Sequence, residues 1–454
     1  KEALTNGTHD FYPTTILISL DGFHPHYISK DLTPFMHNLM IDGYGAPFMI
    51  PSFPSSTFPN HWTLATGLYP SDHGIVGNTF YDPVSKRQFI NTNPKLSLIE
   101  DWWGGESIWH TANLQGVSTA VHMWPGSEVP FTSKGGVPME FDRFNGSEVL
   151  SKKIDRVLGW LDRNISSRPE LILSYVPTID SLGHKFGISG EKLDEGLGYV
   201  DNFLETLYIG LKNRNLTDVV NVVIVSDHGM APTSNNRIIF LDDMVNLSEI
   251  EHIDGWPLFG LRPFSEYSIQ DIYKEIMDNR NKDLKNGNKY DVYLKQDLPK
   301  EWTFAGNIKN QYSDRIAPLW IVPKVGYSII THEEYKNKNY DYTPKGVHGY
   351  NNTEVLMRAL FLGTGPFFKD RLGEDLNSLK IRPFENIEVY NIICDSLNLK
   401  PAPNNGTITG GTSIVNSKYL LPQNFEDLYD YPNVSFVHDV NIMRENATYD
   451  TLWR

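Results

Sequence analysis

The stretch TTILISLDGF, residues 14–23, decides the fold that the sequence predicts. In it an apolar run, 16–20, leads directly into Asp21, and two later stretches repeat this pattern: NVVIVSDHGM at 221–230 and LILSYVPTIDSLGH at 171–184. Short β-branched runs between helical segments are typical of buried parallel strands. The sequence therefore predicts an α/β fold with a central, mostly parallel sheet flanked by helices.

Carboxylate and imidazole side chains follow these apolar runs. In open α/β sheets, ligands bind outside the carboxyl ends of the strands, so we expect these side chains to meet at one edge of the sheet. Each alone would be a turn residue or a helix cap, but together they form two compact sets of nitrogen and oxygen ligands, which suit zinc, with manganese or iron as alternatives. The candidate ligands are Asp21, Asp180, His184, Asp227, His228 and, from KGVHGYNN at 345–352, His348.

The stretch SSTFPNHWTLATGLYP, residues 55–70, places Thr57 just before a predicted helix, with Pro59 as the first helical residue, a position that tolerates proline. A helix N-terminus attracts phosphate and favours the ionised form of a nearby hydroxyl. A lone threonine there would be an N-cap. Two metals about 4 Å apart are the usual apparatus of phosphoryl displacement, so this hydroxyl belongs to the same candidate site.

At this point the chain resembles the ectonucleotide pyrophosphatase/phosphodiesterase family of the alkaline phosphatase superfamily. The resemblance rests on ILISLDGF, PSFPSSTFPNHWTLATGLYPSDHGIVGNTFYDP, MWPGSE, DSLGHKFG, VSDHGM and GVHGY, and more weakly on FLGTGPFF. It implies an alkaline-phosphatase-like sheet, a Thr57 nucleophile and two Zn²⁺ per chain. One zinc would be held by Asp180, His184 and His348, and the other, which also meets the Thr57 oxygen, by Asp21, Asp227 and His228.

Candidate substrate contacts are an amide and several aromatic rings. The resemblance implies that Asn78, in GNTFYDP, donates its amide to a developing phosphate oxygen, and that Phe58 and the position aligned with Phe144 sandwich a nucleobase. Trp124 and Tyr175 are further candidates for the wall of this pocket, although core packing is the commoner use of aromatic residues.

Residues 50–70 contain no lysine or arginine, which favours a phosphodiester over a phosphomonoester dianion. We therefore expect hydrolysis of nucleoside triphosphates, dinucleotides or nucleotide sugars to nucleoside 5′-monophosphates, through a covalent nucleotidyl-threonine. The alternatives are a lysophospholipid or other phosphodiesterase, a sister phosphomonoesterase or phosphoethanolamine transferase, and a non-enzymatic glycoprotein scaffold. The formal net charge of −15 argues against general nucleic-acid binding.

Other histidines are expected outside the ligand sets. We expect His24 and His26 at the surface or behind the ligands, and His61 and His73 in hydrogen bonds within the fold.

The candidate ligands span most of the chain, so we predict one catalytic domain over residues 1–400. Residues 242–345, polar and rich in Tyr, Asn and Lys, are expected to form an inserted subdomain, and residues 401–454 a loop-rich extension.

The sequence predicts a glycosylated protein of the secretory route, extracellular or lumenal. Nine Asn-x-Ser/Thr sequons are roughly twice the number expected by chance, and the lone cysteine, Cys394, cannot form an internal disulfide. No signal peptide or membrane-spanning run is visible in the sequence given, which begins close to the first strand. We expect an ectodomain whose signal or membrane anchor has been removed.

Overall fold

The computed structural model describes residues 1–305, 311–373 and 381–420. Within them, the central sheet is mostly parallel, as predicted: only β20 runs antiparallel to its neighbours. Its strand order is β4 (Tyr44–Gly45), β20 (Phe361–Thr364), β11 (Val220–Val225), β3 (Thr14–Leu20), β10 (Leu171–Val176), β8 (Thr119–His122) and β9 (Glu140–Asp142).

The central strands are buried on both faces. Every residue of β3, β10 and β11 is buried. In β3, Leu17 packs into one hydrophobic cluster, whereas Ile16 and Ile18 pack into another. Because successive side chains of a strand point to opposite faces, these two clusters are the two sides of the sheet. This double burial explains why the runs are continuously apolar rather than alternating.

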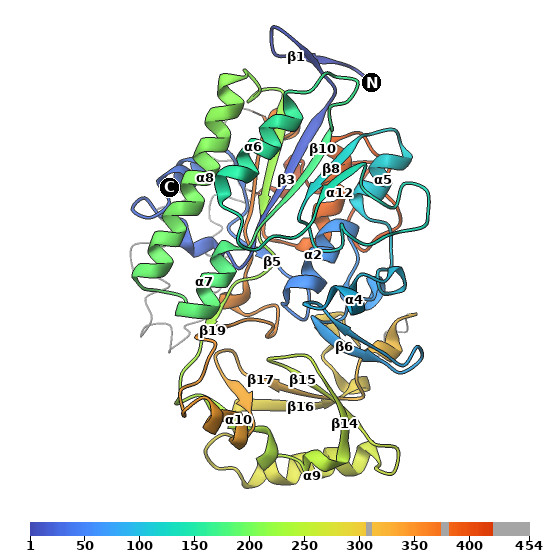
Figure 1. Ribbon diagram of the computed structural model, residues 1–454, viewed down its shortest axis with the longest axis vertical. Helices are drawn as coiled ribbons and strands as arrows, with labels where there is room; N and C mark the ends of the chain where they lie inside the picture. Colours follow the sequence, from blue (N-terminus) through green and yellow to red (C-terminus); the bar gives the residue numbers. More distant parts are fainter. Residues whose placement is uncertain (306–310, 374–380, 421–454) are drawn as a thin grey trace.

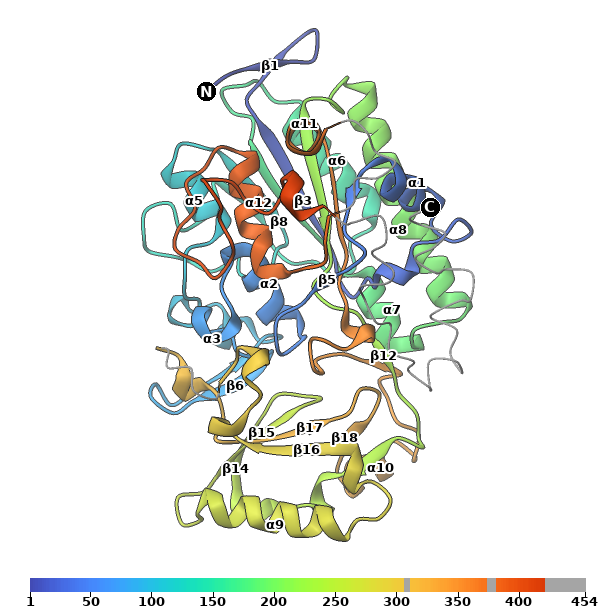
Figure 2. The same ribbon diagram turned by 180° about the vertical axis from the view of Figure 1, so that it is seen from behind.

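Helices cover both faces of the sheet (Figures 1 and 2). The Ile16 side is covered by α1 (Pro34–Asp42), α6 (Leu150–Leu161), α7 (Thr178–Phe186) and α8 (Glu191–Asn213). The Leu17 side is covered by α2 (Thr57–Thr66), α5 (Ile108–Leu114) and α12 (Val389–Ser396). This is an alkaline-phosphatase-like α/β fold.

A second, antiparallel sheet lies at the end of the molecule toward which the central strands point (Figure 1). Its order is β14 (Ile250–Asp254), β15 (Phe259–Pro263), β17 (Leu319–Pro323) and β16 (Tyr290–Leu294). Helix α9 (Ile269–Lys282) packs on it through Ile272 and Ile276. The sheet lies inside the segment 242–345 for which the sequence predicts an insertion. Of the predicted C-terminal extension, residues 421–454 lie outside the described part of the chain.

Smaller elements connect these layers. The short helices are α3 (Pro70–His73), α4 (Pro94–Ser97), α10 (His332–Asn337) and α11 (Pro366–Leu372). The short strand pairs are β1 (Leu4–Thr5) with β2 (Asp10–Phe11), β5 (Met49–Ile50) with β21 (Phe384–Glu385), β6 (Thr79–Asp82) with β7 (Arg87–Ile90), β12 (Ala231–Pro232) with β19 (Gly346–Val347), and β13 (Ile238–Phe240) with β18 (Ser328–Ile330). Among the described residues, no helix combines the length and apolar character needed to cross a bilayer.

Helix α2 begins two residues earlier than the sequence predicted. Thr57 is its first residue and Ser56 its N-cap, so Pro59 stands third. Proline is tolerated there because the first N–H groups of a helix have no intrahelical partner. The helix ends at Gly67, whose φ of 71° lies in the left-handed region that glycine adopts without strain.

Arg315 joins the segment 242–345 to the part of the molecule built around the central sheet. The side chain is 7 % exposed, and its Nε lies 3.2 Å from Asp82 Oδ2 in β6. Its remaining N–H groups donate to the carbonyl oxygens of Gly74, Trp102 and Asp101 at 2.8–2.9 Å. A buried guanidinium with every partner from the core fixes the position of the segment that carries it.

Replacing Arg315 should therefore destabilise the whole molecule. Arg315→Gln leaves the buried Asp82 carboxylate without its counter-ion, and we expect a loss of about 3 kcal/mol or more in unfolding free energy. The control is Lys274→Gln, which breaks the exposed pair with Asp278 and should leave the unfolding free energy nearly unchanged. Chemical denaturation measures both; equal, small losses would show that Arg315 does not hold the two parts together.

Candidate active site

The three aspartates predicted as ligands meet at the carboxyl edge of the central sheet. Asp21 directly follows β3, Asp227 follows β11, and Asp180 lies in the first turn of α7, just after β10. Backbone hydrogen bonds fix their spacing: the Asp180 N–H donates to the Asp21 carbonyl oxygen at 2.9 Å, and the Gly22 N–H donates to Asp227 Oδ1 at 3.1 Å. The three carboxylates therefore come together where the sheet topology predicted.

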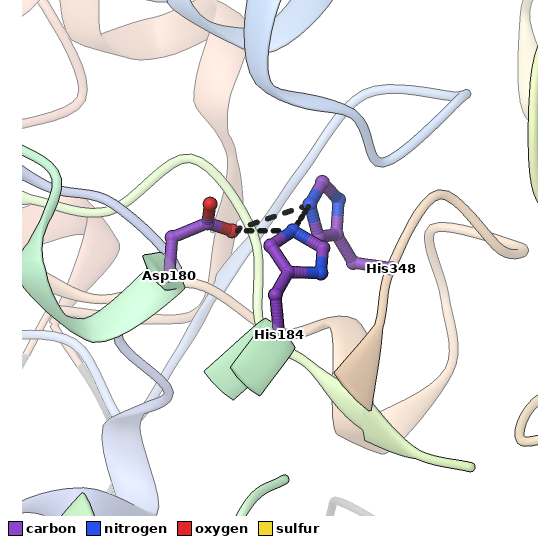
Figure 3. A group of neighbouring side chains, drawn as sticks. All are labelled: Asp180, His184 and His348. Atoms are coloured by element: carbon purple, nitrogen blue, oxygen red, sulfur yellow. Dashed lines mark hydrogen bonds and ion pairs between the residues drawn. The ribbon is translucent and has the colours of Figure 1, made fainter. Parts of the chain in front are cut away.

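Asp180, His184 and His348 form the first group (Figure 3). Asp180 Oδ1 lies 3.4 Å from His184 Nε2 and 3.2 Å from His348 Nε2, and the two Nε2 atoms are 3.2 Å apart. His184 is one helical turn beyond Asp180 in α7, so both side chains lie on one face of that helix. His348 directly follows β19, so it comes after the segment 242–345 in the sequence.

Asp21, Asp227 and His228 gather beside the first group. His228 Nε2 lies 3.2 Å from Asp21 Oδ1 and 3.0 Å from Asp227 Oδ2. The same nitrogen is 3.2 Å from Thr57 Oγ1, at the N-terminus of α2. It is also 3.8 Å from Asp180 Oδ1, so the two groups adjoin. The structure thus brings all six candidate ligands and the candidate nucleophile into one site.

Backbone carbonyls orient all three histidines. Nδ1 of His184, His348 and His228 lies 2.8, 2.9 and 2.6 Å from the carbonyl oxygens of Gly346, Ser55 and Gly229, respectively. A carbonyl oxygen only accepts, so each Nδ1 carries a proton, and in the neutral ring Nε2 keeps its lone pair. Histidines that bind metals are held in this way.

The carboxylate oxygens that face these nitrogens are buried and make no hydrogen bond: Asp21 Oδ1, Asp180 Oδ1 and Asp227 Oδ2. Lone pairs of nitrogen and oxygen that converge at about 3 Å repel one another unless a cation lies between them. The residues present therefore fit bound divalent metal ions.

The electrostatics of the site also demand positive charge. Burial, followed by the Asp180 and Asp227 carboxylates, raises the pKa of Asp21 to about 7. Burial lowers the pKa of His228, but Asp227 and Asp21 outweigh burial and raise this pKa well above its ordinary value. A proton or a metal ion thus relieves the same repulsion, and the two compete.

Asn78 and Phe58 lie beside the nucleophile. Asn78 Oδ1 accepts a hydrogen bond from the Phe58 N–H at 3.0 Å, which leaves the Asn78 NH₂ group as a donor. The Phe58 ring is half-buried and packs edgewise near Phe89 and Trp103.

The other aromatic candidates differ in exposure. Phe144 is 58 % exposed, and its ring centroid lies 6.4 Å from that of Tyr175, which is buried and donates its hydroxyl to Asp21 Oδ2. Trp124 is 1 % exposed and donates to the His61 carbonyl oxygen at 3.2 Å. The substrate contact of Trp124 stays a prediction; in the structure this ring is buried and its indole N–H has a backbone partner.

Comparison with known proteins decides the family. Residues 15–351 match the family model described as type I phosphodiesterase / nucleotide pyrophosphatase. The chain belongs to this family. Its members hydrolyse phosphodiester and pyrophosphate bonds, so the protein is a hydrolase of this class.

Curated relatives from two yeasts support the assignment to this phosphodiesterase family. An uncharacterised pyrophosphatase/phosphodiesterase of Schizosaccharomyces pombe is 43 % identical over 409 residues, 90 % of this chain and 81 % of the relative. Ectonucleotide pyrophosphatase/phosphodiesterase 1 of Saccharomyces cerevisiae is 36 % identical, and the match covers 99 % of this chain and 64 % of the relative.

A solved murine structure shows the same phosphodiesterase fold. Ectonucleotide pyrophosphatase/phosphodiesterase 5, an inactive variant in complex with AMP, superposes with a TM-score of 0.75 at 26 % identity and covers 87 % of this chain and 97 % of its own.

His61 stands behind the ligands of this phosphodiesterase site. It lies close enough to Asp21 and Asp227 to form a metal-binding group, with Nδ1 3.3 Å from Asp227 Oδ2. However, the same Nδ1 lies 2.8 Å from the Thr57 carbonyl oxygen and therefore carries a proton, and Nε2 lies 2.8 Å from Ser19 Oγ. Both ring nitrogens are thus used within the fold, as the sequence predicted.

The other histidines expected outside the ligand sets, His24, His26 and His73, are also internal. His73 Nε2 lies 3.0 Å from the Pro59 carbonyl oxygen, as expected of a hydrogen bond within the fold. His24 and His26 are buried rather than at the surface, with His24 Nε2 2.6 Å from the Val355 carbonyl oxygen.

The sequence did not predict which groups orient the three candidate histidine ligands. These groups are backbone carbonyls, which every residue has, so no residue type identifies them. The sequence also did not predict Trp256 of the inserted segment as a neighbour of the site; its ring centroid lies 6.3 Å from that of His184.

Two histidine variants should separate ligands from supports. His228→Gln removes an Nε2 lone pair from between two carboxylates, so we expect bound metal to fall by about one ion per chain. His61→Gln removes only a donor, and should retain the metal while lowering the melting temperature. Elemental analysis and thermal unfolding of both variants test this; loss of metal from His61→Gln alone would make His61 the ligand.

Proposed function

We propose that the protein hydrolyses phosphodiester and pyrophosphate bonds of nucleotides through a covalent nucleotidyl-threonine, and releases nucleoside 5′-monophosphates. The observation that carries this proposal is the position of Thr57 Oγ1, 3.2 Å from His228 Nε2 at the N-terminus of α2. There the hydroxyl lies beside His228 of the second group, within the partial positive charge of the helix N-terminus.

Two zinc ions are the cofactors that we propose. Asp180, His184 and His348 would hold one, and Asp21, Asp227 and His228 the other, with the Thr57 oxygen as a further ligand. Zinc accepts this mixture of imidazole and carboxylate ligands and, when bound, polarises a phosphoryl oxygen and favours the ionised hydroxyl. Elemental analysis distinguishes two zinc ions per chain from manganese or iron.

Thr57 supplies the nucleophile in this mechanism. Its Oγ1 forms a bond to the phosphorus of the nucleotide and its hydroxyl proton is released to solvent, while the bond to the leaving group breaks on the opposite side and the electron pair departs with that group. Asn78 donates its amide to a non-bridging oxygen as negative charge develops there. In the second step, water attacks the same phosphorus and the phosphorus–Oγ1 bond breaks; the Thr57 oxygen keeps the electron pair and takes a proton from the water, and the nucleoside 5′-monophosphate is released.

Aromatic rings are proposed to select nucleotides. The exposed ring of Phe144 and the half-buried ring of Phe58 would stack on the two faces of the base, with Tyr175 at the wall between Phe144 and Asp21. The AMP bound to the murine neighbour supports nucleotide as the ligand class. Nucleoside triphosphates, dinucleotides and nucleotide sugars all contain the required unit.

We further propose that the protein is a glycoprotein of the secretory route, extracellular or lumenal. The support is the number of sequons and the ectonucleotide names of its relatives. Of the sequon asparagines, Asn145, Asn164, Asn215, Asn246 and Asn405 are exposed.

Product analysis with ATP tests the proposed reaction. If the base lies at Phe58 and the α-phosphorus faces Thr57, AMP and pyrophosphate are the first products. Lysophosphatidylcholine and nitrophenyl phosphate serve as competing substrates for the lipid and monoester alternatives. Inorganic phosphate as the first product from ATP, or preferred turnover of either competitor, would contradict the proposal.

Thr57→Ala should abolish turnover without unfolding the protein. Alanine has no oxygen to attack phosphorus, so we expect kcat to fall by a factor of about 10³ or more, with only direct attack by water remaining. Metal content should change little, since the aspartates and histidines are intact. A variant with near wild-type kcat would rule out the covalent mechanism.

Phe58→Ala should raise KM for nucleotides far more than KM for a small aryl methyl phosphate diester. Stacking one base on an aromatic ring contributes roughly 1–3 kcal/mol, or about one to two decades in affinity. Phe144→Ala should show the same pattern. The measurement is kcat/KM for both substrates; equal losses on the two would assign these rings to packing instead of base binding.

A further inference from the structure

A buried histidine outside the ligand groups bridges two acidic residues. His122 ends β8 and is 4 % exposed. Its Nδ1 lies 2.7 Å from Asp142 Oδ2, and its Nε2 lies 2.7 Å from Glu148 Oε1. Carboxylate oxygens only accept, so both ring nitrogens are placed to donate.

The two carboxylates remain ionised in this setting. Burial opposes the ionisation of Asp142, but His122 and Arg156 outweigh burial and lower the pKa of Asp142 to about 2. Burial likewise opposes ionisation of Glu148, and His122 and Lys153 outweigh it and lower its pKa. The bridge therefore joins the imidazole ring to two ionised carboxylates, and hydrogen bonds to ionised acceptors are stronger than neutral ones.

Asp142 and Glu148 are the two ends of one loop. Asp142 is the last residue of β9, and Glu148 lies two residues before α6. Two cations from α6 support one end each: Arg156 Nε is 2.9 Å from Asp142 Oδ2, and Lys153 Nζ is 3.2 Å from Glu148 Oε1. Among the described residues that contact these carboxylates, His122 is the one that reaches both ends.

The loop between them carries Phe144. The stretch 143–147 is exposed. Its backbone is held by the Phe144 N–H, which donates to Glu128 Oε2 at 3.2 Å, and by a local turn in which Asn145 Oδ1 accepts from the Ser147 N–H at 3.1 Å. The Phe144 ring lies next to Tyr175, whose hydroxyl donates to the candidate ligand Asp21. An exposed ring on a loop has little packing of its own, so the anchors of the loop set its position.

We propose that His122 is a positioning residue for substrate binding: by joining Asp142 to Glu148 it closes the base of the loop 143–147 and holds Phe144 at the edge of the active site. This inference rests on the proposed nucleotide-binding role of Phe144. His122 touches neither the candidate ligands nor Thr57, so its effect is on the binding of the base and not on the chemical step.

His122→Gln tests this role. A glutamine amide donates from one end only and presents an oxygen at the other, so it cannot bridge two carboxylates. Complete loss of one stacked ring weakens binding by about tenfold or more. We therefore expect KM for a nitrophenyl nucleotide diester to rise by up to about tenfold, while kcat stays within about twofold. Glu148→Gln, which releases one end of the loop, should raise KM by a smaller factor.

The matched control is Arg163→Gln. Arg163 pairs with Glu140 in the same charged network, 2.7 Å away, but does not contact the ends of the loop. Its KM should equal that of wild type. Thermal unfolding of each variant shows whether the fold is retained.

A double variant decides whether His122 acts through Phe144. If it does, adding His122→Gln to Phe144→Ala should change KM no further, because coupled residues are non-additive. Additive effects, or equal losses for the nucleotide and for a small aryl methyl diester, would overturn the proposal. Failure of the proposed nucleotide hydrolysis gives a different result from failure of this inference. In that case the wild-type protein itself would show no preference for the nucleotide diester over the small aryl methyl diester.

Discussion

Electrostatic repulsion among three buried carboxylates is the constraint on which the rest of this structure depends. Asp21, Asp180 and Asp227 are held together by backbone hydrogen bonds that the sheet and α7 impose, and three imidazole lone pairs converge on them. Such an arrangement is stable only with cations inside it. Folding and metal binding are therefore linked, and the positions of the ligands determine where Thr57 must lie.

The inserted segment contributes to the active site as well as to the surface. It separates His228 from His348 in the chain, yet His348 returns to within 3.2 Å of Asp180. Arg315 and Asp82 fix the insertion against the hairpin that follows Asn78, and Trp256 reaches the neighbourhood of His184. The geometry around the nucleophile thus depends on contacts far from it in sequence.

The sequence predicted the elements whose signals are local. Continuous apolar runs ending in Asp21 and near Asp227 indicated buried parallel strands, and these strands are present. The start of α2 was misplaced because Ser56 and Thr57 can both cap a helix. The burial of the Trp124 ring was not predicted because a sequence does not reveal the exposure of a ring. The carbonyls that orient His184, His228 and His348 carry no side-chain signal. The catalytic roles of the site residues stay predictions that kinetics must test.

The order of the ligands along the chain has a consequence for biosynthesis. Asp21, Asp180, His184, Asp227 and His228 all leave the ribosome before the inserted segment, and His348 emerges 120 residues after His228 (348 − 228). At roughly 5–20 residues per second, this interval lasts about 6–24 s. During this time the nascent chain has its acidic ligands but lacks an imidazole and strand β20. The nascent chain therefore presents the carboxylates of the candidate metal site before that site is complete. The candidate site can be completed only after the inserted segment has been synthesised and has folded.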